Sequence, residues 1–182
     1  MIDAPPSPPR PQTGAHPILT TPKHWPPKHW IASGGGIGRV PFAPGTVASL
    51  AAVLIGAPVL WLDARLLTLL ALLTCVIGIW AIPGAIKGAV QVTNEQGDPG
   101  WIVIDEFAGQ WIAMLGLGRV SLYGLIAAFV LFRLFDITKP GPVGWADRRH
   151  DAVGVMADDV IAGLIAAALL FIATILLPNV IP

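Results

Sequence analysis

Five apolar segments separated by short polar links limit most strongly what this chain can fold into. They cover approximately residues 45–62, 66–82, 101–117, 120–135 and 160–177. A helix needs about 17 to 25 mainly apolar residues to cross the hydrocarbon layer of a bilayer, so each segment is near the lower limit. The mean hydropathy is +0.71 and only 12% of the residues are charged, compared with about 25% in soluble domains. We therefore expect an all-α integral membrane protein, a bundle of about four to five apolar helices.

The links between the segments predict how the helices are connected. Asp63-Ala64-Arg65 and Gly118-Arg119 are short enough to make antiparallel hairpins of the first pair and of the middle pair. Pro83 and Pro178 are expected to end two of the helices, and Pro58 is a candidate kink in the first.

The distribution of lysine and arginine predicts an orientation. If five segments cross in turn, Arg65 and Arg119 lie on the side opposite the amino terminus. The other basic residues gather on the first side, with Arg133 in the helical turn next to it: Arg10, Lys23, Lys28, Arg39, Lys87, Lys139, Arg148 and Arg149. This asymmetry makes the first side cytoplasmic. The formal net charge is zero, so nothing in the composition indicates binding to nucleic acid.

The amino-terminal region differs in composition from the rest of the chain. Residues 1–27 hold nine of the 18 prolines, and such a stretch can neither form regular backbone hydrogen bonds nor bury a core. We expect residues 1–28 to form a disordered tail and residues 29–182 to form one membrane domain. The tetrad Pro-Lys-His-Trp occurs at residues 22–25 and 27–30, which is typical of an interfacial anchor. A metal site is disfavoured because His24 and His29 do not share a helical face.

Acidic residues are scarce in this chain. The predicted order of membrane crossings nevertheless places most of the acids in and beside the apolar segments at the same depth in the bilayer. Only Asp63 lies on the opposite side, whereas the cytoplasmic level receives Asp105, Glu106, Asp136, Asp147, Asp158 and Asp159. Carboxylate oxygens gathered from several helices are suitable ligands for Mg²⁺, which usually binds one or two carboxylates together with water and phosphate oxygens. The sequence therefore predicts a divalent-cation site.

Helix capping is the alternative explanation for these acids. Asp158-Asp159 stands where we expect a helix to start, Asp105-Glu106 does so if its helix begins there, and an acid at a helix start is favourable by about 1 kcal/mol. Asp136 is different, because it ends a helix, where the helix dipole disfavours an anion. Its own alternative role is an ion pair with Arg133 or Lys139. For the whole set we favour metal or phosphate chemistry, since ionisable groups near the bilayer core are usually functional.

Basic and small residues complement the acids. Arg133, Lys139 and Arg148 could hold a phosphate, with Arg39 on the same side. The stretch of residues 34–46, GGGIGRVPFAPGT, ends in Thr46 and opens a helix whose amino end could receive an anion. It is neither a P-loop nor a dinucleotide motif.

No protein nucleophile stands out in the sequence. Cys75 does not begin a Cys-x5-Arg motif, which would form a loop around a thiolate, and Asp136 does not begin an Asp-x-Asp motif. His150 is interpreted as a solvated loop residue. Water activated by a metal is the remaining nucleophile.

Four motifs in order carry a resemblance to a known family. They are PFAPGTVAS (41–49), VIDEFAGQWI (103–112), FRLFDITKPGPV (132–143) and GVMADDVIAG (154–163). Over about residues 29–177 the chain resembles phosphatidylglycerophosphatase A. The family departs from this chain at Ala48, where glycine is more frequent, and at Ala152-Val153, where a glycine pair is usual; both concern backbone geometry beside the expected site.

The resemblance implies an all-helical, magnesium-dependent phosphatase that converts phosphatidylglycerophosphate to phosphatidylglycerol in bacterial membranes. It further implies that the active site consists of Asp105, Glu106, Asp136, Lys139, Asp158 and Asp159.

Together these observations predict a Mg²⁺-dependent lipid phosphatase of the bacterial inner membrane, with a phospholipid substrate and an active site that faces the cytoplasm. The sequence does not identify a protein partner. The expected metal ligands are Asp105, Glu106, Asp158 and Asp159. Asp136 is expected to be a further ligand or the base that orients water, while Lys139 and Arg133 neutralise the phosphate, and Thr46, Arg39 and Arg148 bind it.

Two other functions are possible for an acid-bearing membrane protein. A divalent-cation transporter would need acids at mid-depth in the apolar segments, and none is present there. A CDP-alcohol phosphotransferase, another membrane lipid-phosphate enzyme, should show Asp-Gly-x2-Ala-Arg followed by two spaced aspartates, and this chain does not.

Overall fold

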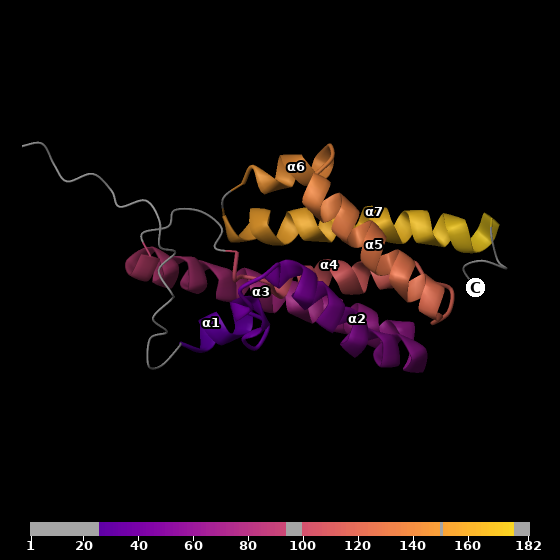
Figure 1. Ribbon diagram of the computed structural model, residues 1–182, viewed down its shortest axis with the longest axis horizontal. Coiled ribbons are helices and arrows are strands. Elements are labelled where there is room, and N and C mark those ends of the chain that lie inside the picture. Colours follow the sequence, from indigo (N-terminus) through magenta and orange to yellow (C-terminus); the bar gives the residue numbers. More distant parts are fainter. Residues whose placement is uncertain (1–25, 94–99, 150, 177–182) are drawn as a thin grey trace, which may run out of the picture.

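The structure is a computed structural model that describes residues 26–93, 100–149 and 151–176. Over these residues it is helical and contains no strand (Figure 1). The elements are α1 (Pro27–Ala32), the short 3-10 helix η1 (Ile37–Arg39), α2 (Pro44–Leu62), α3 (Ala64–Thr93), α4 (Ile104–Met114), α5 (Leu122–Thr138), α6 (Pro142–Asp147) and α7 (Ala152–Leu176). The prediction of an all-α bundle is confirmed.

Helices α2 and α3 form the first expected hairpin. Asp63 leaves the helical conformation between them, and its side-chain Oδ1 accepts a hydrogen bond of 2.8 Å from the backbone N–H of Arg65. This contact satisfies one of the free N–H groups at the start of α3. A single residue therefore reverses the chain direction.

Pro83 does not end a helix, and this expectation was wrong. Helix α3 continues through Pro83 to Thr93. A proline inside a helix removes one backbone hydrogen bond and crowds the preceding turn. Packing offsets this cost, because Ile82 and Ala85 are buried in one cluster with Ala32 of α1. Pro58 likewise lies inside α2, and Pro178 lies outside the described residues.

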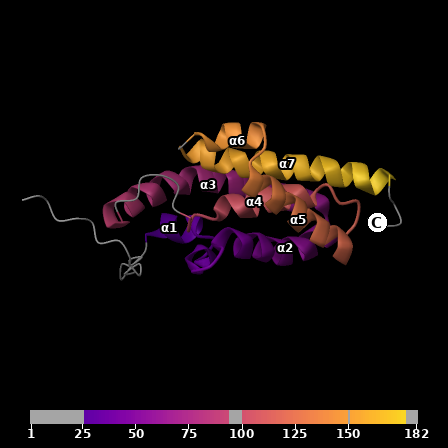
Figure 2. The same ribbon diagram turned by 45° about the horizontal axis from the view of Figure 1, so that its top comes forward.

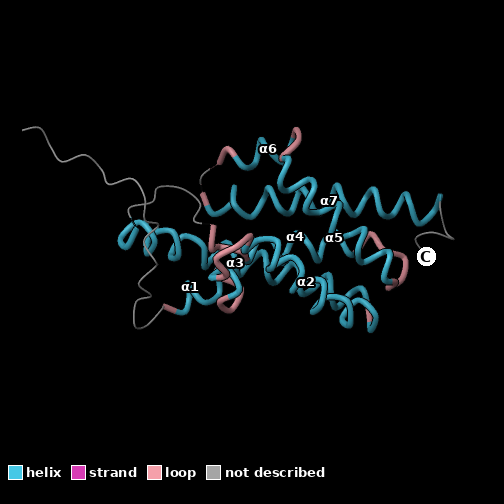
Figure 3. Tube along the Cα trace, in the orientation of Figure 1, coloured by secondary structure: helices cyan, strands magenta, loops and turns pink. Residues whose placement is uncertain are grey.

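Helix α4 occupies the centre of the bundle (Figures 2 and 3). It packs against α2, α3, α5 and α7, and most of its side chains are buried. Trp111 fixes it to α2, since its indole Nε1–H donates a buried hydrogen bond of 2.8 Å to the carbonyl oxygen of Ala52. Gly56 provides the space, because a Cβ there would lie 2.7 Å from the Trp111 ring.

Helices α4 and α7 approach each other closely at two glycines. A Cβ on Gly163 would overlap the carbonyl oxygen of Gly109, and a Cβ on Gly109 would lie 2.6 Å from the carbonyl oxygen of Asp159. Small residues let helix backbones pack closely in this way, as they often do in membrane proteins. The residues one turn earlier on each helix, Asp105 and Asp159, are thereby brought together.

Three helices are long and apolar enough to cross a membrane: Pro44–Leu62 in α2, Ala64–Lys87 in α3, and Ala152–Leu176, which is α7. The segment at 101–117 forms only the 11-residue α4, which rises about 16 Å and reaches roughly half of the 30 Å hydrocarbon layer. Helix α5 has 17 residues. The membrane bundle is thus confirmed, and its short members are the two middle segments.

The expected tail, residues 1–28, lies almost entirely outside the described residues, as does the first Pro-Lys-His-Trp tetrad. The second tetrad forms most of α1 and makes contacts within the protein. The Lys28 Nζ lies 4.4 Å from the centroid of the Trp80 ring. His29 stacks on Trp101 with 5.4 Å between ring centroids, so α1 holds the segment that leads into α4.

Candidate active site

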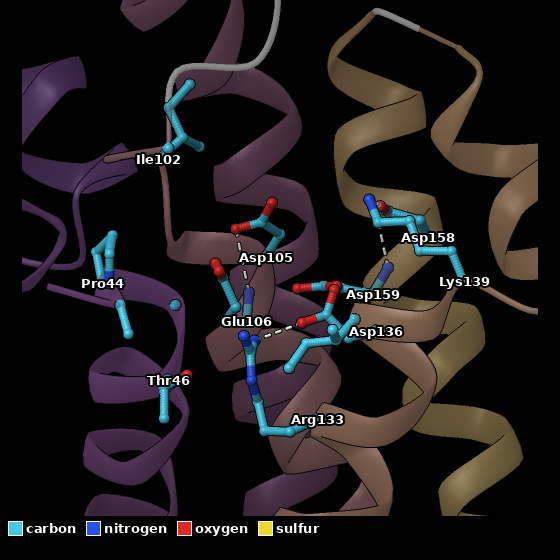
Figure 4. A pocket seen from close by; sticks show the side chains of 14 residues that line it. Pro44, Thr46, Ile102, Asp105, Glu106, Arg133, Asp136, Lys139, Asp158 and Asp159 are labelled. Atoms are coloured by element: carbon cyan, nitrogen blue, oxygen red, sulfur yellow. Dashed lines mark hydrogen bonds and ion pairs between the residues drawn. The ribbon is translucent and has the colours of Figure 1, made fainter.

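A pocket of about 490 Å³ lies where four helices meet. Figure 4 shows its acidic and basic side chains pointing toward one another from α4, α5 and α7, with the first turn of α2 beside them. The lining residues are Ala43, Pro44, Gly45, Thr46, Gly100, Ile102, Asp105, Glu106, Arg133, Asp136, Ile137, Lys139, Asp158 and Asp159.

Asp105 and Glu106 occupy the first turn of α4. The Asp105 Oδ1 accepts a hydrogen bond of 3.1 Å from the backbone N–H of Glu106. Gly45 of α2 faces Glu106 so closely that a Cβ there would overlap the carboxylate oxygen Oε1. A glycine is therefore needed for the start of α2 to approach this carboxylate.

Asp158 and Asp159 lie two turns inside α7, because this helix begins at Ala152. The expectation that they stand at a helix start was wrong. Asp151 makes the capping contact instead, since its Oδ1 accepts a 2.8 Å hydrogen bond from the N–H of Gly154. Both carboxylates are buried within an apolar helix. Capping does not account for them, and their burial without a capping role favours a functional one.

Asp136 and Arg133, three residues apart near the end of α5, form an ion pair. This pair is the alternative role that the sequence analysis gave for Asp136. The pair also lines the pocket, so it belongs to the site rather than competing with it. Lys139 follows in a left-handed conformation, with φ of 46°. Its Nζ donates to Asp158 Oδ2 at 2.9 Å and also pairs with Asp147.

The charges of the pocket are unbalanced. Five carboxylates and two cationic side chains line it, an excess of three negative charges when all are ionised. Burial raises the pKa of Glu106 to about 8; the charges of Asp159 and Asp136 add to this rise, while Asp105 and Arg133 oppose it. Burial alone would lower the pKa of Lys139, but its hydrogen bonds to Asp147 and Asp158 outweigh burial and raise it. Lys139 is therefore a cation at neutral pH.

The donor set fits a hard divalent cation. Asp105, Glu106 and Asp159 each offer one ligand oxygen, and these three oxygens lie within 4.8 Å of one another. Oxygen ligands at such spacing suit Mg²⁺ or Ca²⁺ rather than a softer metal. One oxygen of Glu106 is buried without a hydrogen-bond partner among the described residues, so a cation would also satisfy an otherwise costly group.

Two of the expected phosphate ligands are not in the pocket. Arg39 belongs to η1, and its guanidinium lies 6.0 Å from the centroid of the Trp30 ring. Arg148 is exposed at the end of α6. Neither is among the lining residues, whereas Thr46 is. The expectation about His150 falls on a residue outside the described part of the chain.

Two residues that do not line the pocket but neighbour residues that do were missed or left unassigned by the sequence interpretation. Asp147 holds Lys139, and Gln110 is fully buried one turn after Glu106 with no partner for either amide atom among the described residues. The spacing of four on an expected helix could have flagged Gln110. The contact between Lys139 and Asp147 depends on the turn that follows α5, which carries no comparable pattern.

Comparison with known proteins gives one consistent family. The sequence profile described as phosphatidylglycerophosphatase A matches residues 30–174. Phosphatidylglycerophosphatase A of Escherichia coli (strain K12) is 37% identical over 148 residues, 80% of this chain and 82% of that protein. The protein of the same name from Haemophilus influenzae is 34% identical over 149 residues, 80% of this chain and 87% of that protein.

A third relative carries a different name. A Bacteroides thetaiotaomicron protein named as a candidate phosphatidylinositol-3-phosphatase is 38% identical over 156 residues, 79% of this chain and 91% of that protein. No solved structure gives a significant match to the chain.

Proposed function

The chain belongs to the phosphatidylglycerophosphatase A family, and from this premise we propose that it hydrolyses phosphatidylglycerophosphate to phosphatidylglycerol and inorganic phosphate with the help of Mg²⁺. As a member of the family it is an enzyme, a phosphatase that acts on a phosphate monoester. The lipid substrate, the metal and the residue roles are the proposed parts. The observation that carries the proposal is the convergence of Asp105, Glu106 and Asp159 within 4.8 Å.

Charge explains why a cation belongs in this pocket. A phosphate monoester is a dianion at neutral pH, and the pocket keeps an excess of carboxylate charge over cationic charge even when Glu106 is protonated, so it would repel the substrate. Asp105, Glu106 and Asp159 would hold one or two Mg²⁺ ions, with Asp158 beside them. When bound, such an ion polarises the phosphoryl oxygen and lowers the pKa of a coordinated water.

The other side chains act on the substrate and the attacking water. The water oxygen forms a bond to phosphorus, and the bond between phosphorus and the glycerol oxygen breaks. One proton of the water passes to Asp136, which Arg133 orients; the glycerol oxygen takes up a proton from bulk water, and Asp136 returns its proton to bulk water afterwards. Lys139, held by Asp147 and Asp158, neutralises charge on the phosphate. Thr46 offers its hydroxyl at the opposite wall of the pocket.

The proposed location is the bacterial inner membrane, with the pocket facing the cytoplasm. The three apolar helices support membrane insertion, and the clustering of lysine and arginine near the pocket end supports the orientation. Among the described residues, the carboxylates gather in one pocket rather than along a path through the bundle, so no observation favours a cation transporter.

Phosphate release from a panel of lipids tests this function. The panel contains phosphatidylglycerophosphate, phosphatidic acid and phosphatidylinositol 3-phosphate, each with Mg²⁺ and with EDTA. We expect release from phosphatidylglycerophosphate that EDTA abolishes. Release that is undiminished in EDTA would remove Mg²⁺ from the proposal, and release from none of the lipids would reject the function.

Asn substitutions test the residue roles. Asp105→Asn, Asp136→Asn and Asp159→Asn should each lower phosphate release by roughly 10²–10³-fold, and the first and last should also lose the Mg²⁺-induced rise in unfolding temperature. Asp63→Asn is the matched control: it lies at the α2–α3 link, and asparagine keeps the capping oxygen, so activity should be unchanged. Wild-type turnover in Asp159→Asn would contradict its role as a ligand.

A further inference from the structure

The pocket is bounded on one side by α2 and on another by α5. The first turn of α2 contributes Pro44 and Thr46, and the last turns of α5 contribute Arg133, Asp136 and Ile137. Figure 4 shows these two walls on either side of Glu106. Exposed apolar side chains lie beside these two walls. Phe42, just before α2, is 83% exposed, and Ile137 is 66% exposed.

An exposed apolar strip leads away from each wall. On α2, Leu50 and Leu54 follow Thr46 at a spacing of four, so the three share one side of the helix. On α5, the residues before Ile137 at spacings of four, three and four are Arg133, Val130 and Ile126. These spacings place all four side chains on one side of the helix. About half or more of each of these leucine, valine and isoleucine side chains is exposed.

The two strips begin at one pocket, because Thr46 and Ile137 both line it, and α2 and α5 are also packed against each other. Leu125 and Phe129 of α5 pack against the core cluster that contains Ala52 and Val53 of α2. In Figures 1 and 2 the two helices lie near each other at the end away from the pocket and separate toward it. We call the exposed apolar surface of Leu50, Leu54, Ile126, Val130 and Ile137 the α2–α5 seam.

From this continuity we infer that the acyl chains of the lipid substrate lie along the α2–α5 seam while its phosphate occupies the pocket. The inference rests on the proposed function and specifies how its substrate binds. Thr46 and Ile137 line the pocket that would hold the phosphate, and the apolar strips begin at these residues. From Ile137 to Ile126, α5 rises about 16 Å, which matches the roughly 15 Å hydrocarbon depth of one leaflet.

The seam also explains why the pocket opens beside apolar rather than polar side chains. A water-soluble phosphate ester has no chains to lie against Phe42 or Ile137, whereas a lipid phosphate whose acyl chains lie along the seam reaches the pocket without leaving the bilayer. The surface therefore favours lipid phosphates over soluble ones through KM, leaving the chemistry at the acids unchanged.

Photolabelling tests the seam directly. The probe is a diacylglycerol phosphonate with a diazirine in the middle of one acyl chain, reconstituted with the wild-type protein and Mg²⁺ in phosphatidylcholine vesicles. Its carbon–phosphorus bond is not hydrolysed, so labelling does not depend on turnover. We expect adducts on the seam residues at least several-fold above those on Leu69, Leu72 and Val76 of α3, which are similarly exposed, and competition by phosphatidic acid but not by added phosphatidylcholine.

Kinetics give a second measurement. The triple variant Leu50→Ala, Ile126→Ala, Val130→Ala should raise KM about tenfold for a long-chain lipid phosphate and leave KM for a dibutyryl analogue and kcat unchanged. The matched control is Leu69→Ala, Leu72→Ala, Val76→Ala, which should behave as wild type. Equal labelling of α3 and the seam, or adducts that lipid phosphate does not displace, would overturn the inference. Seam labelling without phosphate release from any lipid would instead reject the proposed function alone.

Discussion

Glu106 stands in the first turn of α4, with one carboxylate oxygen buried and the charges of Asp159 and Asp136 beside it. Its pKa is raised to about 8 from the ordinary 4.5, chiefly by burial. Without a metal, this side chain is therefore mostly protonated at neutral pH. A ligand carboxylate must be ionised to bind a cation, so metal binding at this position should release a proton.

The affinity for Mg²⁺ should consequently rise with pH. Between about pH 6 and 8, release of one proton from Glu106 predicts a roughly tenfold lower dissociation constant per pH unit, with a plateau above 8. Titration with Mg²⁺ at several pH values, followed by calorimetry or by the unfolding temperature, measures this. Glu106→Gln should bind more weakly and lose its part of the slope. An affinity of the wild type that does not change with pH would contradict the assignment.

The same residue affects the stability of the metal-free protein. A carboxyl whose folded pKa lies above its unfolded value stabilises the fold fully below pH 4.5, and this contribution is lost as the pH rises through 8. The metal-free protein should thus unfold at lower temperature at pH 8 than at pH 6, and Mg²⁺ should reverse this difference.

At the scale of the helices, the site depends on how closely α4 and α7 pack. Gly109 and Gly163 meet one turn after Asp105 and Asp159, respectively, and neither leaves room for a Cβ. The glycine contact fixes the distance between the two backbones. The same backbone distance holds one turn away and brings the two acids together. The metal ligands are therefore positioned by residues that never touch a metal.

Gly163→Ala should separate the two helices. The added methyl group would overlap the Gly109 carbonyl, which is backbone and cannot rotate away, so we expect a loss of about 1–3 kcal/mol in the free energy of unfolding, despite the better helix propensity of alanine. The Mg²⁺-induced stabilisation should decline as well. Gly118→Ala is the control, because the nearest atom to its added Cβ lies 4.0 Å away. Chemical unfolding in detergent compares the two, and equal stability would refute the packing argument.

For the whole molecule, the number of crossings decides which ends share a side. Helices α2, α3 and α7 qualify as spans, whereas α4 and α5 are shorter and follow each other in the chain. Because α4 and α5 form a pair, the side of residues 136–159 is the same whether the pair crosses the bilayer or only enters it. The orientation inferred from lysine and arginine is therefore insensitive to the two short helices.

Labelling of single cysteines checks this orientation. In a Cys75→Ser background, Arg65→Cys at the α2–α3 link and Arg148→Cys after α6 are both exposed positions. A membrane-impermeant maleimide applied to intact cells should modify Arg65→Cys and should reach Arg148→Cys only after the membrane is permeabilised. The reverse pattern would place the pocket on the outer face, and modification of both would exclude the predicted crossing.

The sequence by itself determined the class of the protein and the identity of its acids. Hydropathy predicts membrane helices because apolar side chains must leave water and backbone groups must be paired within a helix, and both depend only on local composition. The same local view misjudged Asp158-Asp159, because the apolar stretch from 160 hid two earlier turns that Asp151 caps.

Only the tertiary structure decided that Asp105 and Asp159 meet, that Lys139 joins Asp147 and Asp158, and that Arg39 and Arg148 stay outside the pocket. The meeting of Asp105 and Asp159 joins residues far apart along the chain and follows from close packing at Gly109 and Gly163, whereas the Lys139–Asp147 contact depends on the turn after α5. Periodicity within one helix tells which of its faces is buried, but not against which neighbour or at what height.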